Sequence, residues 1–115
     1  WKLGVKNSDG DRGYFQVSTG SSYEWVFTTE AVGTGVWTHL VGTWDGSMIR
    51  LFRNGVCEDS LVWSGPLNND PTSLYMGTRE PSSSEFLDGR IDEIRLLDYA
   101  LPPSGVRARY NALKP

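Results

Sequence analysis

The run WTHLVGTWDGSMIRLFRNG, residues 37–55, decides the fold of this chain. Apolar and polar side chains alternate along it with the period of two that is typical of β-strands. Two dipeptides interrupt the alternation, Asp45-Gly46 and Asn54-Gly55, and both accept the positive φ angles of a two-residue type I′ turn. The run therefore predicts an antiparallel meander of three strands, with a hairpin turn at each dipeptide.

The first turn sets which side chains share a face of the meander. Placing Trp44 opposite Ser47 separates two sets of side chains, because alternate residues of a strand point to opposite faces. The set expected to face the core is Leu40, Gly42, Ile49 and Leu51. The set expected on the other face is His39, Val41, Arg50 and Phe52.

The second turn sets the register of the last two strands. It places Phe52 opposite Cys57, and Arg50 opposite Asp59 as a cross-strand charge pair. The same register puts Glu58 on the core side, where a carboxylate is costly. We therefore expect a β-bulge at Glu58, or an early end to the pairing.

Composition narrows the class of protein. The chain has 115 residues and a net charge of −3, which suits one soluble domain spanning 1–115. Its lysines and arginines are scattered, so no basic stripe for nucleic acid is expected. No apolar stretch approaches the roughly 18–20 residues that span a bilayer, so no membrane insertion is expected either.

The rest of the chain repeats the strand pattern until about residue 100. We expect strands near 2–6, 13–18, 23–28, 36–44, 47–53, 56–62, 73–78 and 88–97. Such regular short strands predict an all-β sandwich or barrel. Beyond them, Pro103 suits the first turn of a helix, and Val106, Tyr110 and Leu113 recur at i, i+4 and i+7. We expect a short terminal helix with that stripe against the sandwich.

Three motifs in order resemble a known family. They are the run 37–55 itself, LYMG at 74–77, and FLDGRIDEIRLLDYAL at 86–101. Together they resemble the laminin G-like (pentraxin-type) domains of the concanavalin A-like lectin/glucanase superfamily. The resemblance implies a jelly-roll sandwich of two antiparallel sheets with a short C-terminal helix. Structural roles are expected for the motif residues Trp37, His39, Asp45, Gly46, Asn54, Gly55 and Asp92.

The chain departs from the family pattern at two places. Family members usually begin with two further strands, so we expect either a fragment of a longer protein or a sheet edge closed by a second copy, as a homodimer. At the helix start, Pro102 and Gly105 stand where relatives tend to have the Ser and Glu of a capping box.

Catalysis is the least favoured function. The glucanase signature E-x-D-x-x-E is absent, and Asp92 and Glu93 are adjacent, so on a strand they point to opposite faces. There is no Ser-His-Asp order, phosphate loop or Cys/His metal spacing. The single His39 is interpreted as a hydrogen-bonded structural residue rather than a ligand or base, and Cys57 as structural rather than nucleophilic. We expect no enzyme activity.

Aromatic side chains offer a site for sugar, because sugars present apolar C–H faces rimmed by hydroxyl groups. Tyr23 and Trp25 share one strand face, Trp44 adjoins a turn, and Trp63 precedes a Ser-Gly-Pro turn. Each of the four is a candidate ligand contact. Each can instead fill the core, and with five tryptophans in a small domain most of them must do so.

The stretch NSDGDRG, residues 7–13, offers a calcium loop. Asn7, Asp9 and Asp11 have the alternating spacing of oxygen ligands, so Ca²⁺ is the one cofactor considered. The glycine comes one place late, however, and Ser18 stands where a twelfth-position Glu is needed. An ordinary polar turn explains the same residues and is the preferred interpretation.

The leading function is non-catalytic recognition by a lectin-like module of an extracellular or cell-surface protein. Its partner is expected to be a glycan or an extracellular protein. The alternative is a structural or self-association module that binds no soluble ligand. Fold alone does not decide between them.

Overall fold

The computed structural model describes residues 1–68, 73–80 and 82–114. The chain divides into two compact units, one formed by residues 1–68 with 99–115 and the other by residues 69–98. The sandwich and the terminal helix lie in the first, larger unit.

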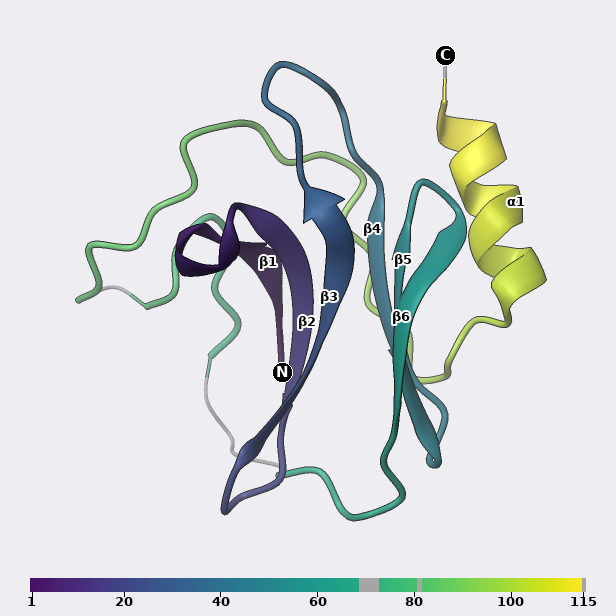
Figure 1. Ribbon diagram of the computed structural model, residues 1–115. Helices are drawn as coiled ribbons and strands as arrows, with labels where there is room; N and C mark the ends of the chain where they lie inside the picture. Colours follow the sequence, from purple (N-terminus) through teal and green to yellow (C-terminus); the bar gives the residue numbers. More distant parts are fainter. Residues whose placement is uncertain (69–72, 81, 115) are drawn as a thin grey trace. The chain divides into compact units, whose positions relative to one another are not determined.

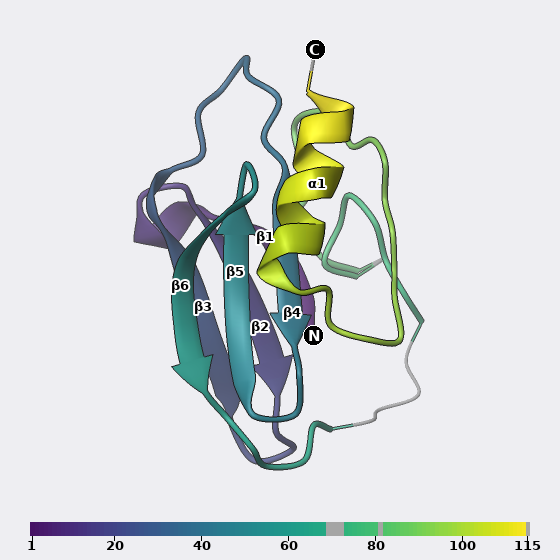
Figure 2. The same cartoon turned by 90° about the vertical axis from the view of Figure 1, so that its right-hand side faces the viewer.

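Two three-stranded antiparallel sheets make up the larger unit (Figure 1). The first has the order β1–β2–β3, with β1 at Lys2–Lys6, β2 at Arg12–Ser18 and β3 at Tyr23–Ala31; a short 3-10 turn, Asn7–Asp9, joins β1 to β2. The second has the order β4–β5–β6, with β4 at Leu40–Trp44, β5 at Met48–Arg53 and β6 at Val56–Val62. The sheets lie face to face, and α1, Pro103–Leu113, lies on the outer side of the second sheet (Figure 2). The prediction of a two-sheet β-sandwich with a short terminal helix is confirmed.

The core lies between the two sheets. Phe15, Val17 and Val26 from the first sheet pack with Ile49 and Leu51 from the second, and all five are buried. The predicted faces of the meander are confirmed, because Gly42 lies opposite Leu51 on the core side. A Cβ atom on Gly42 would lie 2.3 Å from the ring of Phe15, so this ring fills the space that a side chain would need.

The two predicted turns have different outcomes. Asn54 and Gly55, with φ angles of 50° and 82°, form the predicted two-residue turn between Arg53 and Val56. The prediction for the first turn is wrong: Trp44 lies opposite Ile49, not Ser47, so four residues rather than two separate the last paired positions.

Asp45 explains the longer loop. Its Oδ1 atom accepts hydrogen bonds from the backbone N–H groups of Ser47, at 2.9 Å, and Met48, at 2.8 Å. Such a side chain-to-backbone turn competes with the tighter hairpin. The register moves by two residues, and since two is the period of a strand, the predicted faces survive.

The predicted bulge is confirmed at Glu58. Leu51 lies opposite Asp59 and Phe52 opposite Cys57, which leaves Glu58 without a cross-strand partner. The predicted pair of Arg50 with Asp59 is wrong, because the bulge moves Ser60 opposite Arg50.

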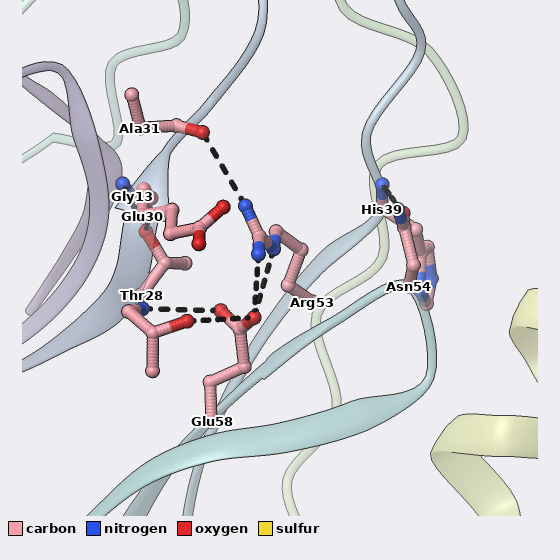
Figure 3. Close-up of polar contacts among 9 residues, drawn as sticks. Gly13, Thr28, Glu30, Ala31, His39, Arg53, Asn54 and Glu58 are labelled. Carbon is pink, nitrogen blue, oxygen red and sulfur yellow. Dashed lines mark hydrogen bonds and ion pairs between the residues drawn. The ribbon is translucent and has the colours of Figure 1, made fainter.

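The bulge directs carboxylates of β6 to the edge of the facing sheet. Asp59 Oδ2 accepts the backbone N–H of Phe27 at 2.9 Å, and Glu58 accepts both the backbone N–H and the hydroxyl of Thr29. Arg53 binds Glu58 at 2.7 Å and donates to the carbonyl of Ala31 at 3.3 Å (Figure 3). These contacts occupy donors on the outer edge of β3 and join the two sheets.

The terminal helix packs as predicted over its first two turns. Val106 is buried and Tyr110 is half-buried, but Leu113 is 41 % exposed, so the predicted stripe does not extend to the last turn. Gly55 lets Tyr110 approach the turn between β5 and β6, since a Cβ there would lie 3.1 Å from the Tyr110 ring. Pro102, at the helix start, makes no side-chain capping hydrogen bond.

Three strand predictions need correction. The strand predicted at 36–44 begins only at Leu40. In the smaller unit, the described residues of the segments 73–78 and 88–97 form no strand, apart from an isolated bridge between Thr78 and Phe86. Glu93 has a φ angle of 53°, a left-handed conformation that a β-strand does not accommodate.

Candidate ligand-binding face

The outer face of the sheet β1–β2–β3 carries a group of aromatic side chains. Because Val26 points into the core, alternation along β3 turns Tyr23, Trp25 and Phe27 to the opposite side. Tyr14 of β2 lies opposite Phe27 and joins them. These four residues are called the aromatic face below.

Three rings of the aromatic face, those of Tyr14, Trp25 and Phe27, contact one another. The centroids of Tyr14 and Trp25 are 5.2 Å apart, and those of Trp25 and Phe27 are 5.8 Å apart with their planes nearly parallel. Gly4 of β1 lies opposite Tyr14, and a Cβ there would come within 3.3 Å of the Tyr14 ring. Mutual packing fixes the orientation of such rings, so this part of the surface is largely preformed.

Exposure differs along the aromatic face. Tyr23 is 59 % exposed, whereas Tyr14, Trp25 and Phe27 are half-buried. Beside them, Gln16 lies opposite Trp25 and is almost completely buried. The aromatic face is therefore partly buried at Tyr14, Trp25 and Phe27 and largely exposed to solvent only at Tyr23.

Two cations lie over these rings. Lys6 Nζ is 4.6 Å from the centroid of the Trp25 ring, and Arg12 Cζ is 4.7 Å from that of Phe27. Asp9 binds Lys6 at 3.0 Å and lies 3.9 Å from Arg12. Asp9 therefore links the two cations beside the aromatic rings.

The other two aromatic candidates lie elsewhere. Trp44 and Trp63 pack against the core, and Trp44 Nε1 donates to the carbonyl oxygen of Trp63 at 3.0 Å. The structure thus brings Tyr23 and Trp25 together and separates them from Trp44 and Trp63. Sequence reasoning missed Tyr14 and Phe27, although alternation from Trp25 already places Phe27 on the same face.

The candidate calcium residues form a polar turn. Asn7 and Asp9 lie in the 3-10 turn, followed by Gly10 and Asp11 with positive φ angles of 70° and 59°. The Asp9 carboxylate is engaged by Lys6 and Arg12. Across residues 1–68, 73–80 and 82–114, no group of three or more His, Cys, Asp or Glu side chains is placed to hold a metal ion. Calcium binding by this loop stays a prediction.

Two hydrogen bonds join Asn54 to the backbone of His39. Asn54 Oδ1 accepts the backbone N–H of His39 at 3.0 Å, and the backbone N–H of Asn54 donates to the His39 carbonyl at 2.9 Å (Figure 3). The ring of His39 lies 6.0 Å from that of Tyr110, and its Nδ1 atom is buried with no hydrogen-bond partner among the described residues. Burial lowers the pKa of His39, which favours the neutral ring.

The remaining motif residues lie at turns and loops. Asp45 binds Arg50 at 2.7 Å, and this contact, with the hydrogen bonds from Ser47 and Met48, holds the pKa of Asp45 well below its ordinary value. Trp37 lies before β4 and is 65 % exposed. In the smaller unit, Asp92 Oδ1 accepts the backbone N–H of Glu93 at 2.8 Å.

Comparison with family models identifies the chain. The model described as the Concanavalin A-like lectin/glucanases superfamily, a laminin G-like family, matches residues 1–107. The chain belongs to this superfamily. The laminin G-like resemblance of the three motifs is thereby confirmed.

A solved structure shares the fold of this laminin G-like domain. It is an S-layer domain-containing protein from Clostridium thermocellum, residues 221–444, with a TM-score of 0.60 and 20 % sequence identity. The match covers 87 % of the laminin G-like chain and 52 % of the other, so the chain spans about half of that structure. Comparison with curated proteins found no match. Among the described residues of the laminin G-like chain, no helix is long and apolar enough to cross a membrane.

Proposed function

We propose that this laminin G-like domain is a non-catalytic binding module that holds a carbohydrate on its aromatic face. The observation that carries the proposal is the outward-facing group of Tyr14, Tyr23, Trp25 and Phe27 on one sheet. Aromatic rings complement the apolar C–H faces of sugars, and the neighbouring charged groups can bind the hydroxyls that rim those faces. An extracellular or cell-surface location accords with the superfamily and with the similarity to an S-layer domain-containing protein.

The test is a glycan array, read once with calcium and once with EDTA. We expect binding in both buffers, because the aromatic face needs no metal. Trp25→Ala should weaken binding about tenfold or more, since a stacked indole buries a large apolar area. Trp37→Ala is the matched control, because Trp37 is exposed but lies in the loop before β4.

Two results would redirect the proposal. Binding that disappears in EDTA would move the site to the loop of Asn7, Asp9 and Asp11. Binding that Trp25→Ala leaves unchanged would remove it from the aromatic face.

Self-association is the second candidate function. The observation that favours it is a set of exposed apolar side chains in the smaller unit: Leu74, Tyr75, Met76, Phe86, Leu87, Ile91, Ile94, Leu96 and Leu97. Apolar surface of this kind marks protein contacts. A blank array together with a mass that rises with protein concentration in analytical ultracentrifugation would favour this candidate over carbohydrate binding.

A further inference from the structure

We infer that His39 is a pH-sensitive contact beneath α1, and that its protonation loosens this helix from the sheet β4–β5–β6. The inference goes beyond the proposed function and does not depend on it. The helix lies on the outer side of one sheet (Figure 2), whereas the aromatic face is the outer side of the other sheet. His39 is the single histidine of the chain, and histidine is the side chain whose ordinary pKa lies closest to neutral pH.

The turn between β5 and β6 holds the backbone of His39 beside α1. The N–H of His39 donates to Asn54 Oδ1 at 3.0 Å, and its carbonyl accepts the N–H of Asn54 at 2.9 Å (Figure 3). The His39 ring lies 6.0 Å from the ring of Tyr110 in α1, with an angle of 30° between the planes. The His39 backbone therefore cannot move away from the helix without breaking both hydrogen bonds.

The Nδ1 atom of His39 makes protonation costly. This atom is buried and has no hydrogen-bond partner among the described residues. In the neutral ring it can remain an unprotonated acceptor, but in the imidazolium both ring nitrogens carry a proton. A buried charged donor without an acceptor costs more than a buried lone pair. Burial accordingly lowers the pKa of His39 while α1 is in place.

The charged groups around His39 do not stabilise a proton there. The acidic side chains of β6 are directed to the facing sheet, where Glu58 binds Thr29 and Asp59 binds the N–H of Phe27. None of the ion pairs among the described residues includes His39. The segment 31–44, which contains His39, has no other charged side chain. Tyr110 is the titratable side chain in contact with the ring, and α1 with its C-cap supplies only cations: Arg107, Arg109 and Lys114.

The helix α1 is the element that can yield. It has 11 residues, its N-cap residue Pro102 makes no side-chain hydrogen bond, and no acidic residue lies in its first turn. An isolated helix of this length is marginal in water, so α1 depends on its contact with the sheet. That contact is made by the buried Val106 and the half-buried Tyr110. Lifting Tyr110 opens Nδ1 of His39 to water and relieves the cost of the proton.

The lowered pKa sets the sign of the effect. Above about pH 6.5, His39 is neutral whether α1 is docked or released, so docking is at full strength. As the pH falls toward the lower pKa of the docked state, the released state binds the proton first and docking weakens. The docking equilibrium should fall by about tenfold for each pH unit that separates the two pKa values.

The test combines two measurements on the natural protein. An NMR titration of the Cε1 proton gives the pKa of the single histidine. Hydrogen exchange, corrected for its intrinsic pH dependence, gives the protection of the α1 amides between about pH 7.5 and about pH 4.5. We expect a His39 midpoint below about pH 6.5 and a fall in α1 protection of the size that this midpoint sets, while β2 keeps its protection.

Two variants make the test specific to His39. His39→Gln should remove the pH dependence of α1 protection, because glutamine binds no proton in this range. Asp45→Asn is the matched control, since Asp45 is the other side chain with a lowered pKa but lies in the turn between β4 and β5. The fall in α1 protection should persist in Asp45→Asn. Thermal unfolding of each variant confirms that it is folded.

Four results would overturn the inference. A His39 midpoint at or above about pH 6.5 is the first, and the natural protein gives it even if His39→Gln does not fold. The second is α1 protection that does not change with pH in the natural protein. The others are an equal fall in His39→Gln and a fall that extends equally to β2. None of these results bears on carbohydrate binding, which the glycan array tests separately.

Discussion

Gly42 lies in β4 where the ring of Phe15, from the facing sheet, occupies the space of a side chain. A Cβ atom would come within 2.3 Å of that ring. We expect Gly42→Ala to lower the free energy of unfolding by about 1–3 kcal/mol, the usual cost of overpacking a core. Urea denaturation measures the change. Gly33→Ala is the control, because a Cβ on Gly33 meets no atom within 4 Å, and equal stability of the two variants would contradict this packing.

Asp45 makes stability depend on pH in a defined direction. Arg50 and the turn N–H groups lower the pKa of Asp45 in the folded state. As the pH falls below about 4, the Asp45 carboxylate is therefore protonated in the unfolded chain before it is protonated in the folded protein. The stabilisation is present above that pH and is lost as the pH falls through the lower, folded-state pKa. We expect the stability advantage of the natural protein over Asp45→Asn to shrink between about pH 6 and about pH 2. Urea denaturation across this range checks it, and a constant difference would contradict it.

At the scale of elements, the bulge in β6 adds polar contacts between the two sheets to the apolar core that they share. Glu58 binds both Arg53 of β5 and Thr29 of β3, and the side chains of Glu58 and Arg53 are only 13 % and 22 % exposed. We expect Glu58→Ala to lower the free energy of unfolding by about 1–3 kcal/mol, because Arg53 and the N–H of Thr29 lose their acceptor.

The matched control for this prediction is Glu85→Ala. Glu85 pairs with Arg79 at 3.5 Å, but both side chains are more than half exposed, so we expect a change below about 1 kcal/mol. Chemical denaturation compares the two variants. If Glu58→Ala costs no more than Glu85→Ala, the bulge does not join the sheets.

The same elements show what sequence can predict. Alternation alone predicts β4, β5 and the orientation of Gly42 toward the core. The same pattern would place the Glu58 carboxylate on the core side, and this conflict predicts the bulge. Alternation does not predict the first turn, because two donors of Ser47 and the backbone N–H of Met48 bind the Asp45 carboxylate and favour the longer loop. Nor does alternation foresee the left-handed conformation of Glu93, whose backbone N–H donates to Asp92 Oδ1.

At the scale of the whole molecule, tertiary packing decides which aromatic residues can bind. Sequence identifies Trp25, Trp44 and Trp63 as equal candidates, since each lies in or near a predicted strand. Only the pairing of sheets separates them, with Trp44 and Trp63 against the core and Trp25 on the outer face. The cations over that face come from β1 and β2, and their proximity to it depends on strand order.

The most direct measurement uses the indole N–H signals of the five tryptophans in a ¹⁵N–¹H correlation spectrum. The protein is titrated with the glycan that the array binds. The account predicts a saturable shift of the Trp25 signal, with the signals of Trp44 and Trp63 unchanged. Shifts of Trp44 or Trp63 while the Trp25 signal stays in place would contradict the central claim that the aromatic face holds the ligand.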